Sequence, residues 1–270
     1  MALPRVLVTR AAQDAARWVD LLEQQGIPAQ ALPLIAIRPL SDPALQAALQ
    51  HARMQCASYR AVMFVSGNAA RHFFETKEAP SLTSRALTAI KTRYWAPGPG
   101  TVRALQASGV ALAAIDGPAP DAGQFDSEAL WRQVAPQVRP GDRVLIVRGT
   151  DEPGRPGGQG RDWLATQLRS AGAQVDFVAS YERGAPVLDE QQARLARAAS
   201  GSAFLWLFSS KEALRHLLAW LPGHDWSGAH ALATHPRIAQ TARDAGFGQV
   251  HGSRPALADV VSSIKSLHEH

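Results

Sequence analysis

The sequence predicts an α/β fold of two similar domains, each a parallel sheet flanked by helices, joined by a two-stranded β tether. Three observations lead to this prediction. Short apolar runs alternate with amphipathic stretches, several blocks of sequence recur in the same order, and two proline-bounded segments occupy equivalent places in the repeats. Alternation of this kind is typical of parallel sheets that are covered by helices on both faces.

The expected elements follow one another along the whole chain. Strands are predicted at residues 5–9, 28–38, 60–65, 92–96, 111–115, 142–147, 174–182, 202–208, 229–233 and 248–251. Helices are predicted at 12–25, 43–53, 67–76, 100–108, 126–135, 160–171, 189–199, 210–220, 236–245 and 256–267. Several helices begin where a strand ends in Ser, Gly or Thr, which are residues that cap helix N-termini.

The chain contains an internal repeat. The strand sequence at 5–10 returns at 143–148, an offset of 138, whereas the glycines that close the following helices are 146 residues apart. The second copy therefore carries eight extra residues between strand and helix. The matched blocks are 5–10 with 143–148, Gly26 with Gly172, 64–70 with 207–213, and 96–109 with 233–246. A repeat of this size indicates two similar structural units.

Two extended segments, 33–39 and 180–186, interrupt the alternation at equivalent places in the two copies. If they pair as tether strands, residues 40–180 form an inserted domain. Residues 1–36 and 184–270 then join to form a discontinuous domain, with a hinge where the chain crosses twice.

Composition favours a cytoplasmic protein that binds a small anion. No apolar run reaches the length of a membrane span, the N-terminus lacks the long apolar segment of a secretory signal, and the single cysteine, Cys56, forbids an internal disulfide. The net charge of +5 attracts anions, yet the arginines are scattered and no nucleic-acid-binding motif is present. We therefore expect no nucleic acid and no membrane as partners. No exposed apolar stripe stands out, which favours a monomer.

The candidate site lies in the loops that follow the strands. In parallel α/β sheets, ligands bind at the carboxyl ends of strands, where helix N-termini present free N–H groups. The repeat supplies matching loops there in both domains: Thr9-Arg10 and Arg148-Gly149, Ser66-Gly67-Asn68 and Ser209-Ser210-Lys211, Gly98-Pro99-Gly100-Thr101 and Thr234-His235-Pro236. Together they would line one cleft rich in amides, hydroxyls and cations, which suits carboxylates. Any single serine or threonine among them is better explained as a helix cap, and only the set as a whole indicates a site.

Other chemistries have weaker signals. The glycine-rich stretch 154–160 misses the spacing of a dinucleotide-binding loop and lacks a P-loop lysine, so it is interpreted as a flexible insertion. No histidine pair has metal-ligand spacing with a third ligand nearby, and no G-x-S-x-G elbow is present. No metal and no cofactor are expected. Tyr181 lies on a predicted tether strand, where it is either a site residue or a structural one.

The assembled motifs resemble those of the uroporphyrinogen-III synthase family over nearly the whole chain. They are Val8-Thr9-Arg10, Phe64-Val65-Ser66-Gly67-Asn68-Ala69, Gly98-Pro99-Gly100-Thr101, Ser127-Glu128-Ala129-Leu130, Arg148-Gly149, Gly160-Arg161, Leu164, Leu168, Gly172, Val175, Tyr181, Phe208-Ser209-Ser210 and Ala239. Each motif is short, and their order and spacing carry the resemblance. Members of that family have two α/β domains joined by a two-stranded tether.

The resemblance implies a cofactor-free reaction. Hydroxymethylbilane, a linear tetrapyrrole with eight carboxylates, would lose water and close to uroporphyrinogen III with ring D inverted. Departure of the hydroxyl generates an electrophilic azafulvene, and attack by the substituted ring-D carbon passes through a spiro intermediate. Holding the two chain ends in that geometry is where such an enzyme gains its rate. A transient contact with the enzyme that makes the bilane is a further expectation.

The resemblance also assigns roles to residues. Tyr181 would assist departure of the hydroxyl group. The expected substrate-binding residues are Arg10, Ser66, Gly67, Asn68, Thr101, Arg148, Ser209, Ser210, Lys211, Thr234 and His235. One departure stands out: the family often has a second Gly-Pro-x-Thr-Ala pattern, and its threonine position here is Ile238. Thr234 or His235 would replace that contact, or it is absent.

Two other functions remain as alternatives. A hinged two-domain protein that binds a small polyanion without catalysis would have a similar outline, although the lack of a signal sequence counts against it. A nucleotide-dependent transferase would need a phosphate-binding loop that the sequence does not supply.

Overall fold

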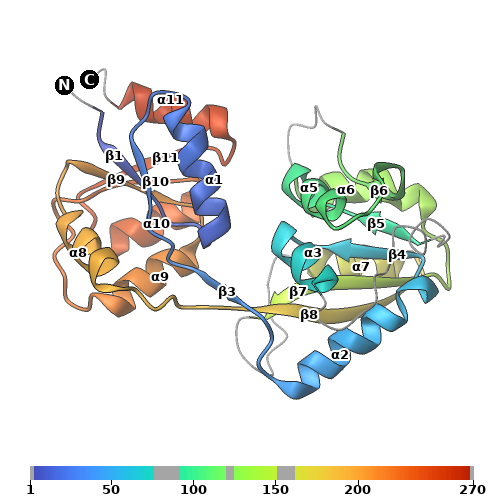
Figure 1. Ribbon diagram of the computed structural model, residues 1–270. Helices are drawn as coiled ribbons and strands as arrows, with labels where there is room; N and C mark the ends of the chain where they lie inside the picture. Colours follow the sequence, from blue (N-terminus) through green and yellow to red (C-terminus); the bar gives the residue numbers. More distant parts are fainter. Residues whose placement is uncertain (1–2, 76–91, 120–124, 151–161, 268–270) are drawn as a thin grey trace. The chain divides into compact units, whose positions relative to one another are not determined.

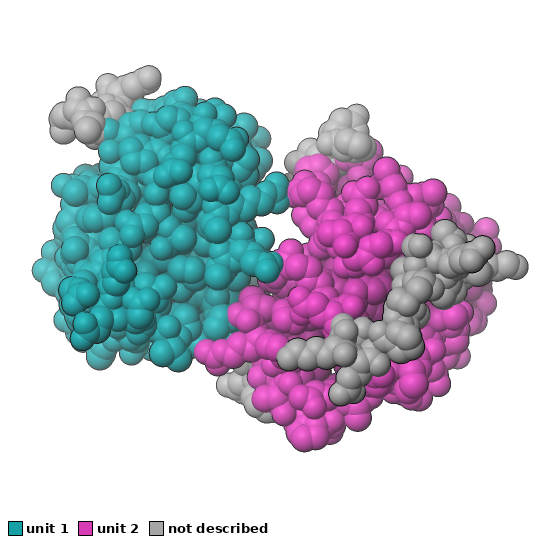
Figure 2. Space-filling model, viewed as in Figure 1, with its two compact units in different colours: residues 1–36, 184–270 teal, residues 37–183 magenta. Residues whose placement is uncertain are grey.

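The computed structural model describes residues 3–75, 92–119, 125–150 and 162–267 (Figure 1). The chain divides into two compact units, which are coloured separately in Figure 2. Unit 1 comprises Met1–Ala36 and Gly184–His270, and unit 2 comprises Ile37–Arg183. Each unit is an α/β layer structure, so the predicted fold class of parallel sheets flanked by helices is confirmed.

Unit 1 is built on a five-stranded parallel sheet. Its strands are β1 (Arg5–Val8), β2 (Ala29–Ala31), β9 (Phe204–Phe208), β10 (His230–Ala233) and β11 (Gln249–Gly252). Its helices are α1 (Ala12–Glu23), α8 (Glu190–Ala198), α9 (Lys211–Trp220), α10 (Pro236–Asp244) and α11 (Leu257–Ser266). The strand order is β11-β10-β9-β1-β2, and every pairing is parallel.

Both faces of the unit 1 sheet are covered by helices (Figure 1). Side chains of β1 and β9 alternate between two apolar clusters, as the period of a strand requires. Val6 and Val8 pack with α1 and α11, whereas Leu7 packs with the cluster formed by α8, α9 and α10. The strands are therefore apolar on both faces, which explains their nearly continuous hydrophobic sequences.

Unit 2 is built on a six-stranded sheet. Its strands are β3 (Ala36–Arg38), β4 (Ala61–Phe64), β5 (Arg93–Trp95), β6 (Ile115–Asp116), β7 (Arg143–Thr150) and β8 (Gln174–Gly184). Its α-helices are α2 (Pro43–Met54), α3 (Gly67–Phe74), α5 (Pro99–Ala107), α6 (Ser127–Val134) and α7 (Asp162–Ser170). The order is β3-β8-β7-β4-β5-β6, and the pairings from β8 to β6 are all parallel. Helices α2, α3 and α5 cover one face, and α6 and α7 cover the other.

The internal repeat corresponds to equivalent strands in the two sheets. β1 lies between β9 and β2 in unit 1, and β7 lies between β4 and β8 in unit 2. The next strands also correspond. β10 pairs with β9 as β5 pairs with β4, and β11 pairs with β10 as β6 pairs with β5. The recurring strand sequence therefore marks the same position in each sheet.

The repeated glycines end helices in both units. Gly26 and Gly172 have φ angles of 74° and 83°, and Gly109 and Gly246 have 90° and 88°. In each case the following N–H donates to a carbonyl five residues before it, as Ile27 N does to Leu22 O at 3.0 Å. This left-handed helix ending favours glycine because any Cβ would be strained there.

Some predicted elements differ in the structure. The predicted strand 28–38 is two short strands, because β2 belongs to the unit 1 sheet and β3 to the unit 2 sheet. Leu32 and Leu34 between them are buried in the unit 1 core and donate their N–H groups to Val8 O at 3.0 Å and Thr9 O at 3.2 Å. At 111–115 a short 3₁₀ helix, Leu112–Ala114, precedes β6, so most of that strand prediction was wrong. The glycine-rich stretch 154–160 lies outside the described residues.

Candidate functional site

The turn from β4 into α3 carries three of the predicted site residues. Ser66 is the N-cap of α3, and its Oγ accepts a hydrogen bond from Ala69 N at 3.2 Å. Asn68 lies in the first turn of α3, and its side-chain carbonyl accepts a hydrogen bond from Arg71. The cap explains why the helix begins here, and it leaves the turn with free backbone N–H groups.

Gly67 lets α5 begin directly against α3. A Cβ at Gly67 would lie 3.2 Å from Gly100 O and 3.4 Å from Ala104 Cβ. Thr101, in the first turn of α5, is 5% exposed. The close contact thus brings the N-termini of two helices, with their partial positive charges, to the same edge of the unit 2 sheet.

Tyr181 lies on β8 beside the carboxyl end of β7. A β-bulge shifts the register, so that Arg148 pairs with Ala179 but Gly149 pairs with Tyr181. A Cβ at Gly149 would lie 2.4 Å from Tyr181 Cζ, so only glycine leaves room for the ring. The Tyr181 hydroxyl is 3.4 Å from Ser66 Oγ. Tyr181 is 3% exposed, so its side chain is almost fully buried. Its contact with Ser66 places its hydroxyl group beside the N-terminus of α3.

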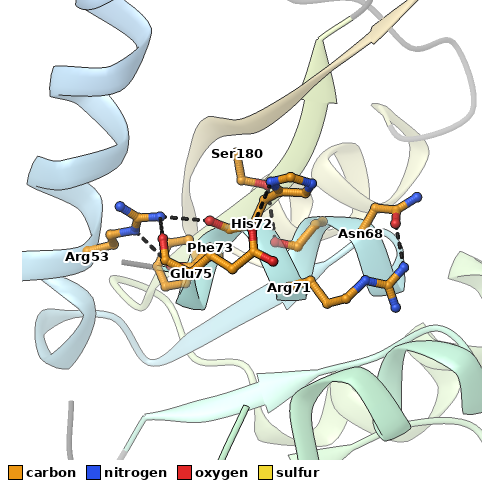
Figure 3. A network of polar contacts seen from close by, with 8 residues as sticks. Arg53, Asn68, Arg71, His72, Phe73, Glu75 and Ser180 are labelled. Carbon is orange, nitrogen blue, oxygen red and sulfur yellow. Dashed lines mark hydrogen bonds and ion pairs between the residues drawn. The ribbon is translucent and has the colours of Figure 1, made fainter. Parts of the chain in front are cut away.

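Polar contacts join α3 to β8 and to its own C-terminal turn (Figure 3). The bulge residue Ser180 donates to Ala69 O at 3.1 Å, which ties β8 to α3. The His72 ring lies 5.7 Å from the Tyr181 ring, and its Nδ1 lies 3.4 Å from a carboxylate oxygen of Glu75. Burial lowers the pKa of His72, and Glu75 acts in the opposite direction. We therefore expect a neutral His72 at pH 7, since its ordinary pKa is about 6.5.

The C-terminus of α3 is held by Arg53 of α2 (Figure 3). Its guanidinium donates to Phe73 O at 2.7 Å, to His72 O at 2.7 Å and to Glu75 O at 3.0 Å. These are carbonyls of the last turn, which have no partner inside the helix. Arg53 therefore fixes the turn that carries His72.

Arg148 does not join Tyr181 and Ser66. Its guanidinium carbon lies 4.4 Å from the centroid of the Phe177 ring, and Phe177 packs with the α6 and α7 side of the sheet. Tyr181 belongs to the opposite side, with α2, α3 and α5. Arg148 is 7% exposed. Side chains alternate between the two faces of a strand, so Arg148 and Tyr181 lie on opposite faces although their strands are neighbours.

In unit 1, Thr9 and Arg10 follow the central strand β1. Thr9 Oγ1 donates to Leu207 O at 2.7 Å and is buried, which makes it a structural link between β1 and β9. The Arg10 guanidinium carbon lies 4.3 Å from the centroid of the Trp18 ring, and its buried Nε has no hydrogen-bond partner. Burial lowers the pKa of Arg10, and nearby Asp14 acts in the opposite direction. Arginine stays protonated in proteins, so Arg10 is a cation with an unused donor.

Ser209, Ser210 and Lys211 form the turn from β9 into α9. Ser210 is the N-cap of α9, and its Oγ accepts from Glu212 N at 3.1 Å. The buried Oγ of Ser209 has no hydrogen-bond partner, and Lys211 is exposed. This turn therefore combines an unused hydroxyl with a solvent-accessible cation.

Thr234 and His235 lead from β10 into α10. Thr234 is 8% exposed, and His235 is the exposed N-cap of α10, whose Nδ1 accepts from Arg237 N at 3.1 Å. Ile238 is the third residue of α10, as Thr101 is of α5, and it is 6% exposed. The threonine position noted in the sequence is thus a buried apolar residue, whereas His235 is the accessible polar one.

Each unit therefore has its own set of site residues, and we describe the two sets separately. The unit 2 edge consists of Ser66, Gly67, Asn68, Thr101 and Tyr181, with Arg148 on the opposite face of the sheet. The unit 1 edge consists of Arg10, Ser209, Ser210, Lys211, Thr234 and His235. Both edges offer N–H and hydroxyl donors, and the unit 1 edge adds the cations Arg10 and Lys211; such groups suit anionic oxygen atoms. Among the residues described, no three His, Cys, Asp or Glu side chains come together as a metal site.

The sequence interpretation missed His72, Ser180, Arg53 and the role of Gly149 as the residue that makes room for Tyr181. Ser180 and Gly149 adjoin predicted site residues, so their place in the sequence was a usable signal. Arg53 and His72 gave no such signal, because their contacts depend on how α2 packs beside α3. In the described part of the chain, no helix has the length and apolar character to cross a membrane.

A comparison with family models identifies one family. The family model described as uroporphyrinogen-III synthase HemD matches residues 16–262. The solved structure of uroporphyrinogen-III synthetase from Helicobacter pylori is similar in fold, with a TM-score of 0.58 at 17% identity, over 98% of this chain and 100% of that one. A mutant uroporphyrinogen III synthase from Thermus thermophilus aligns over 99% of this chain and 100% of that one at 17% identity. Its TM-score of 0.49 is too low to add to the argument.

Proposed function

This chain belongs to the uroporphyrinogen-III synthase family, whose members are hydro-lyases of haem biosynthesis, and we propose that it closes hydroxymethylbilane to uroporphyrinogen III with inversion of ring D. The observation that carries the proposal is the family match over residues 16–262, which spans both units. We further propose that the two units are the two domains of the enzyme and that their edges take up the substrate's carboxylates.

Substrate binding at the edges is supported by the donors found there. Arg10 Nε and Ser209 Oγ are buried without hydrogen-bond partners, and burying a polar group unpaired costs about 1–3 kcal/mol. A substrate carboxylate would satisfy either donor. In unit 2, the adjoining N-termini of α3 and α5 supply backbone N–H groups for the same purpose.

The hydroxyl of Tyr181 is the proposed proton donor. In this step the C–O bond of the terminal hydroxymethyl group breaks, and the departing oxygen takes the phenol proton of Tyr181 and leaves as water. The pyrrole N–H of the same ring then gives its proton to the tyrosinate, and the bilane becomes an azafulvene. Attack by the substituted ring-D carbon then forms the spiro intermediate that inverts ring D. The 3.4 Å contact between the Tyr181 hydroxyl and Ser66 Oγ supports this role, because it gives the tyrosine a polar neighbour at the edge. Tyr181 is 3% exposed, and its role in proton transfer is tested directly by substitution.

The activity is tested by the identity of the porphyrin isomer. The protein is incubated with freshly generated hydroxymethylbilane, the product is oxidised, and the isomers are separated. Spontaneous closure gives the type I isomer, so type III in excess over a protein-free control supports the proposal. Type I alone would overturn it and would favour a noncatalytic polyanion binder, for which direct binding without turnover is the expected observation.

The role of Tyr181 is tested by Tyr181→Phe beside Ser66→Ala and Ser209→Ala. General-acid assistance is worth about 10²–10⁴-fold in favourable cases. We expect Tyr181→Phe to lower kcat toward the low end of that range and by more than either serine substitution. An equal or smaller loss would show that positioning over the whole site, and not the tyrosine hydroxyl, supplies the rate.

We propose that the protein acts in the cytoplasm as a monomer and meets the bilane-producing enzyme only transiently. Cell fractionation and light scattering test the first two statements. Cross-linking with that enzyme in the presence of substrate tests the third, and no cross-link above background would contradict it.

A further inference from the structure

A hollow of about 740 Å³ opens in unit 1 where β10 and β11 end. Three segments line it: one side of α10 with the residues that lead into it, the turn after β11, and one side of α11. Its charged and donor side chains include His235, Arg243, Arg254, Ser262 and Ser263, and its carboxylate is Asp259. Only His235 among these belongs to the unit 1 edge described above.

Hydrogen bonds hold the turn after β11, which lines the hollow, in place. Ser253, in the turn after β11, donates its N–H to Ala233 O at the end of β10, at 2.9 Å. Its Oγ accepts from Ser263 Oγ at 3.1 Å and donates to Arg254 O at 3.0 Å. The turn that carries Arg254 is therefore tied both to the sheet and to α11.

The polar lining is rich in donors. The Nδ1 of His235 accepts from Arg237 N, so a neutral His235 carries its proton on Nε2 and offers it as a donor. Arg243 donates one N–H to Val250 O at 3.4 Å, and a guanidinium has five N–H donors. The lining contains two arginines, Arg243 and Arg254, and one carboxylate, Asp259. Such a site favours a ligand with anionic oxygen atoms.

The equivalent place in unit 2 is built differently. Gly98 is the N-cap of α5, as His235 is of α10, and a Cβ at Gly98 would lie 3.2 Å from Phe125 Cβ. An aromatic side chain thus packs against the helix start in unit 2, whereas unit 1 has an open, cationic hollow. The two helix starts therefore have different neighbours, and the cationic lining described here belongs to unit 1.

We propose that this hollow is a second carboxylate-binding site, which holds an acetate or propionate side chain of the tetrapyrrole through Arg254 and Arg243. The identity of the ligand rests on the proposed function, but the capacity of the hollow to bind carboxylates does not. Arg254 and Arg243 act in binding only, so their loss should weaken capture of the substrate and leave the choice of isomer unchanged.

The carboxylate site is tested first without turnover. Citrate is titrated into the ¹⁵N-labelled protein, and we expect shifts in the amides of 235–237, 252–254 and 259–263. Arg254→Gln should weaken this binding about tenfold, a loss of one charge-assisted contact. Arg237→Gln is the matched control, because Arg237 is an exposed arginine of the same helix that does not line the hollow, and it should bind citrate as the wild type does. Absent shifts, or equal weakening in both variants, would overturn the proposal.

The tetrapyrrole is tested second. With hydroxymethylbilane, Arg254→Gln should raise KM several-fold with an unchanged type III to type I ratio, and Arg237→Gln should change neither. An unchanged KM for Arg254→Gln beside intact citrate binding in the wild type would overturn the tetrapyrrole as the ligand. If the wild type formed no type III isomer, the proposed function would fail, while the citrate titration would still decide whether the hollow binds carboxylates.

Discussion

Tyr181 of β8 pairs with Gly149 of β7. The Tyr181 ring lies so close to Gly149 that a side chain at position 149 would overlap it. The aromatic ring, the bulge at Ser180 and the glycine form one arrangement, in which each part depends on the others. Sequence reasoning identified Tyr181 as either a site residue or a structural one. Its burial and its contact with Ser66 show that its ring has a packing role, whatever its hydroxyl does.

We predict that Gly149→Ala displaces Tyr181. The new Cβ would lie 2.4 Å from Tyr181 Cζ, so the ring or the strand must move. Overpacking of this kind costs about 1–3 kcal/mol. Denaturant unfolding should show that loss, and type III formation should fall more than in a core variant of equal stability loss. Gly184→Ala is the control, because nothing lies within 4 Å of its Cβ position. Unchanged stability in Gly149→Ala would mean that the ring relaxes freely.

A second prediction concerns His72 and pH. Burial holds the pKa of folded His72 below its ordinary value, so folding favours the neutral ring. The stability that this supplies is present above the ordinary pKa and is lost as the pH falls through the folded pKa. Glu75, Arg71 and Arg53 are the charged groups that act on it.

The measurement is the free energy of unfolding between pH 7 and pH 5. It should fall more steeply for the wild type than for His72→Gln, which cannot take up the proton. Other groups, such as His251, whose pKa burial also lowers, contribute equally to both proteins and cancel in the difference. Parallel curves would show that His72 does not titrate differently in the folded state.

At the scale of single elements, helix ends decide where the site residues lie. Ser66, Ser210 and His235 cap α3, α9 and α10, so the predicted binding residues are also the residues that start these helices. The sequence analysis noted both roles for such residues. The structure shows that they are not alternatives: a capped helix start presents further N–H groups beside the cap.

The C-terminus of α3 provides an element-scale prediction. Arg53→Ala should destabilise the protein by about 2 kcal/mol, because it removes charged hydrogen bonds to three helix-end carbonyls. Arg194→Ala is the matched control. Its ion pair with Glu190 is exposed at the surface, so we expect a loss below about 0.5 kcal/mol. The two values come from urea unfolding, and equal losses would contradict a clamping role for Arg53.

On the scale of the whole molecule, each unit has its own apolar core on both faces of its own sheet. Leu217 is fully buried in unit 1 and Leu105 in unit 2. Replacing either by Ala should cost about 2–5 kcal/mol. Because the clusters are separate, we expect each substitution to lower amide-exchange protection in its own unit only.

Hydrogen exchange read by mass spectrometry checks this expectation. Peptides from β9 to α11 should exchange faster in Leu217→Ala, and peptides from β4 to β7 should exchange faster in Leu105→Ala. Equal acceleration throughout the chain in either variant would show that the two units unfold as one cooperative body.

The amino-acid sequence by itself determined the fold class, the duplication and the family. These depend on features that repeat along the chain: two-faced apolar strands, glycines at helix ends and hydroxyl caps, each of which is a local requirement of backbone geometry. The similar sequences at residues 5–10 and 143–148 were enough to predict that β1 and β7 occupy equivalent positions in the two sheets.

Only the tertiary structure decided which side chains meet. Arg148 and Tyr181 are close on neighbouring strands, yet they lie on opposite faces of the sheet. Arg53 reaches carbonyls about 20 residues away, and the hollow beside Arg254 is formed by three separate segments. Such contacts depend on the packing of elements against one another, which no pattern within a single segment of the sequence records.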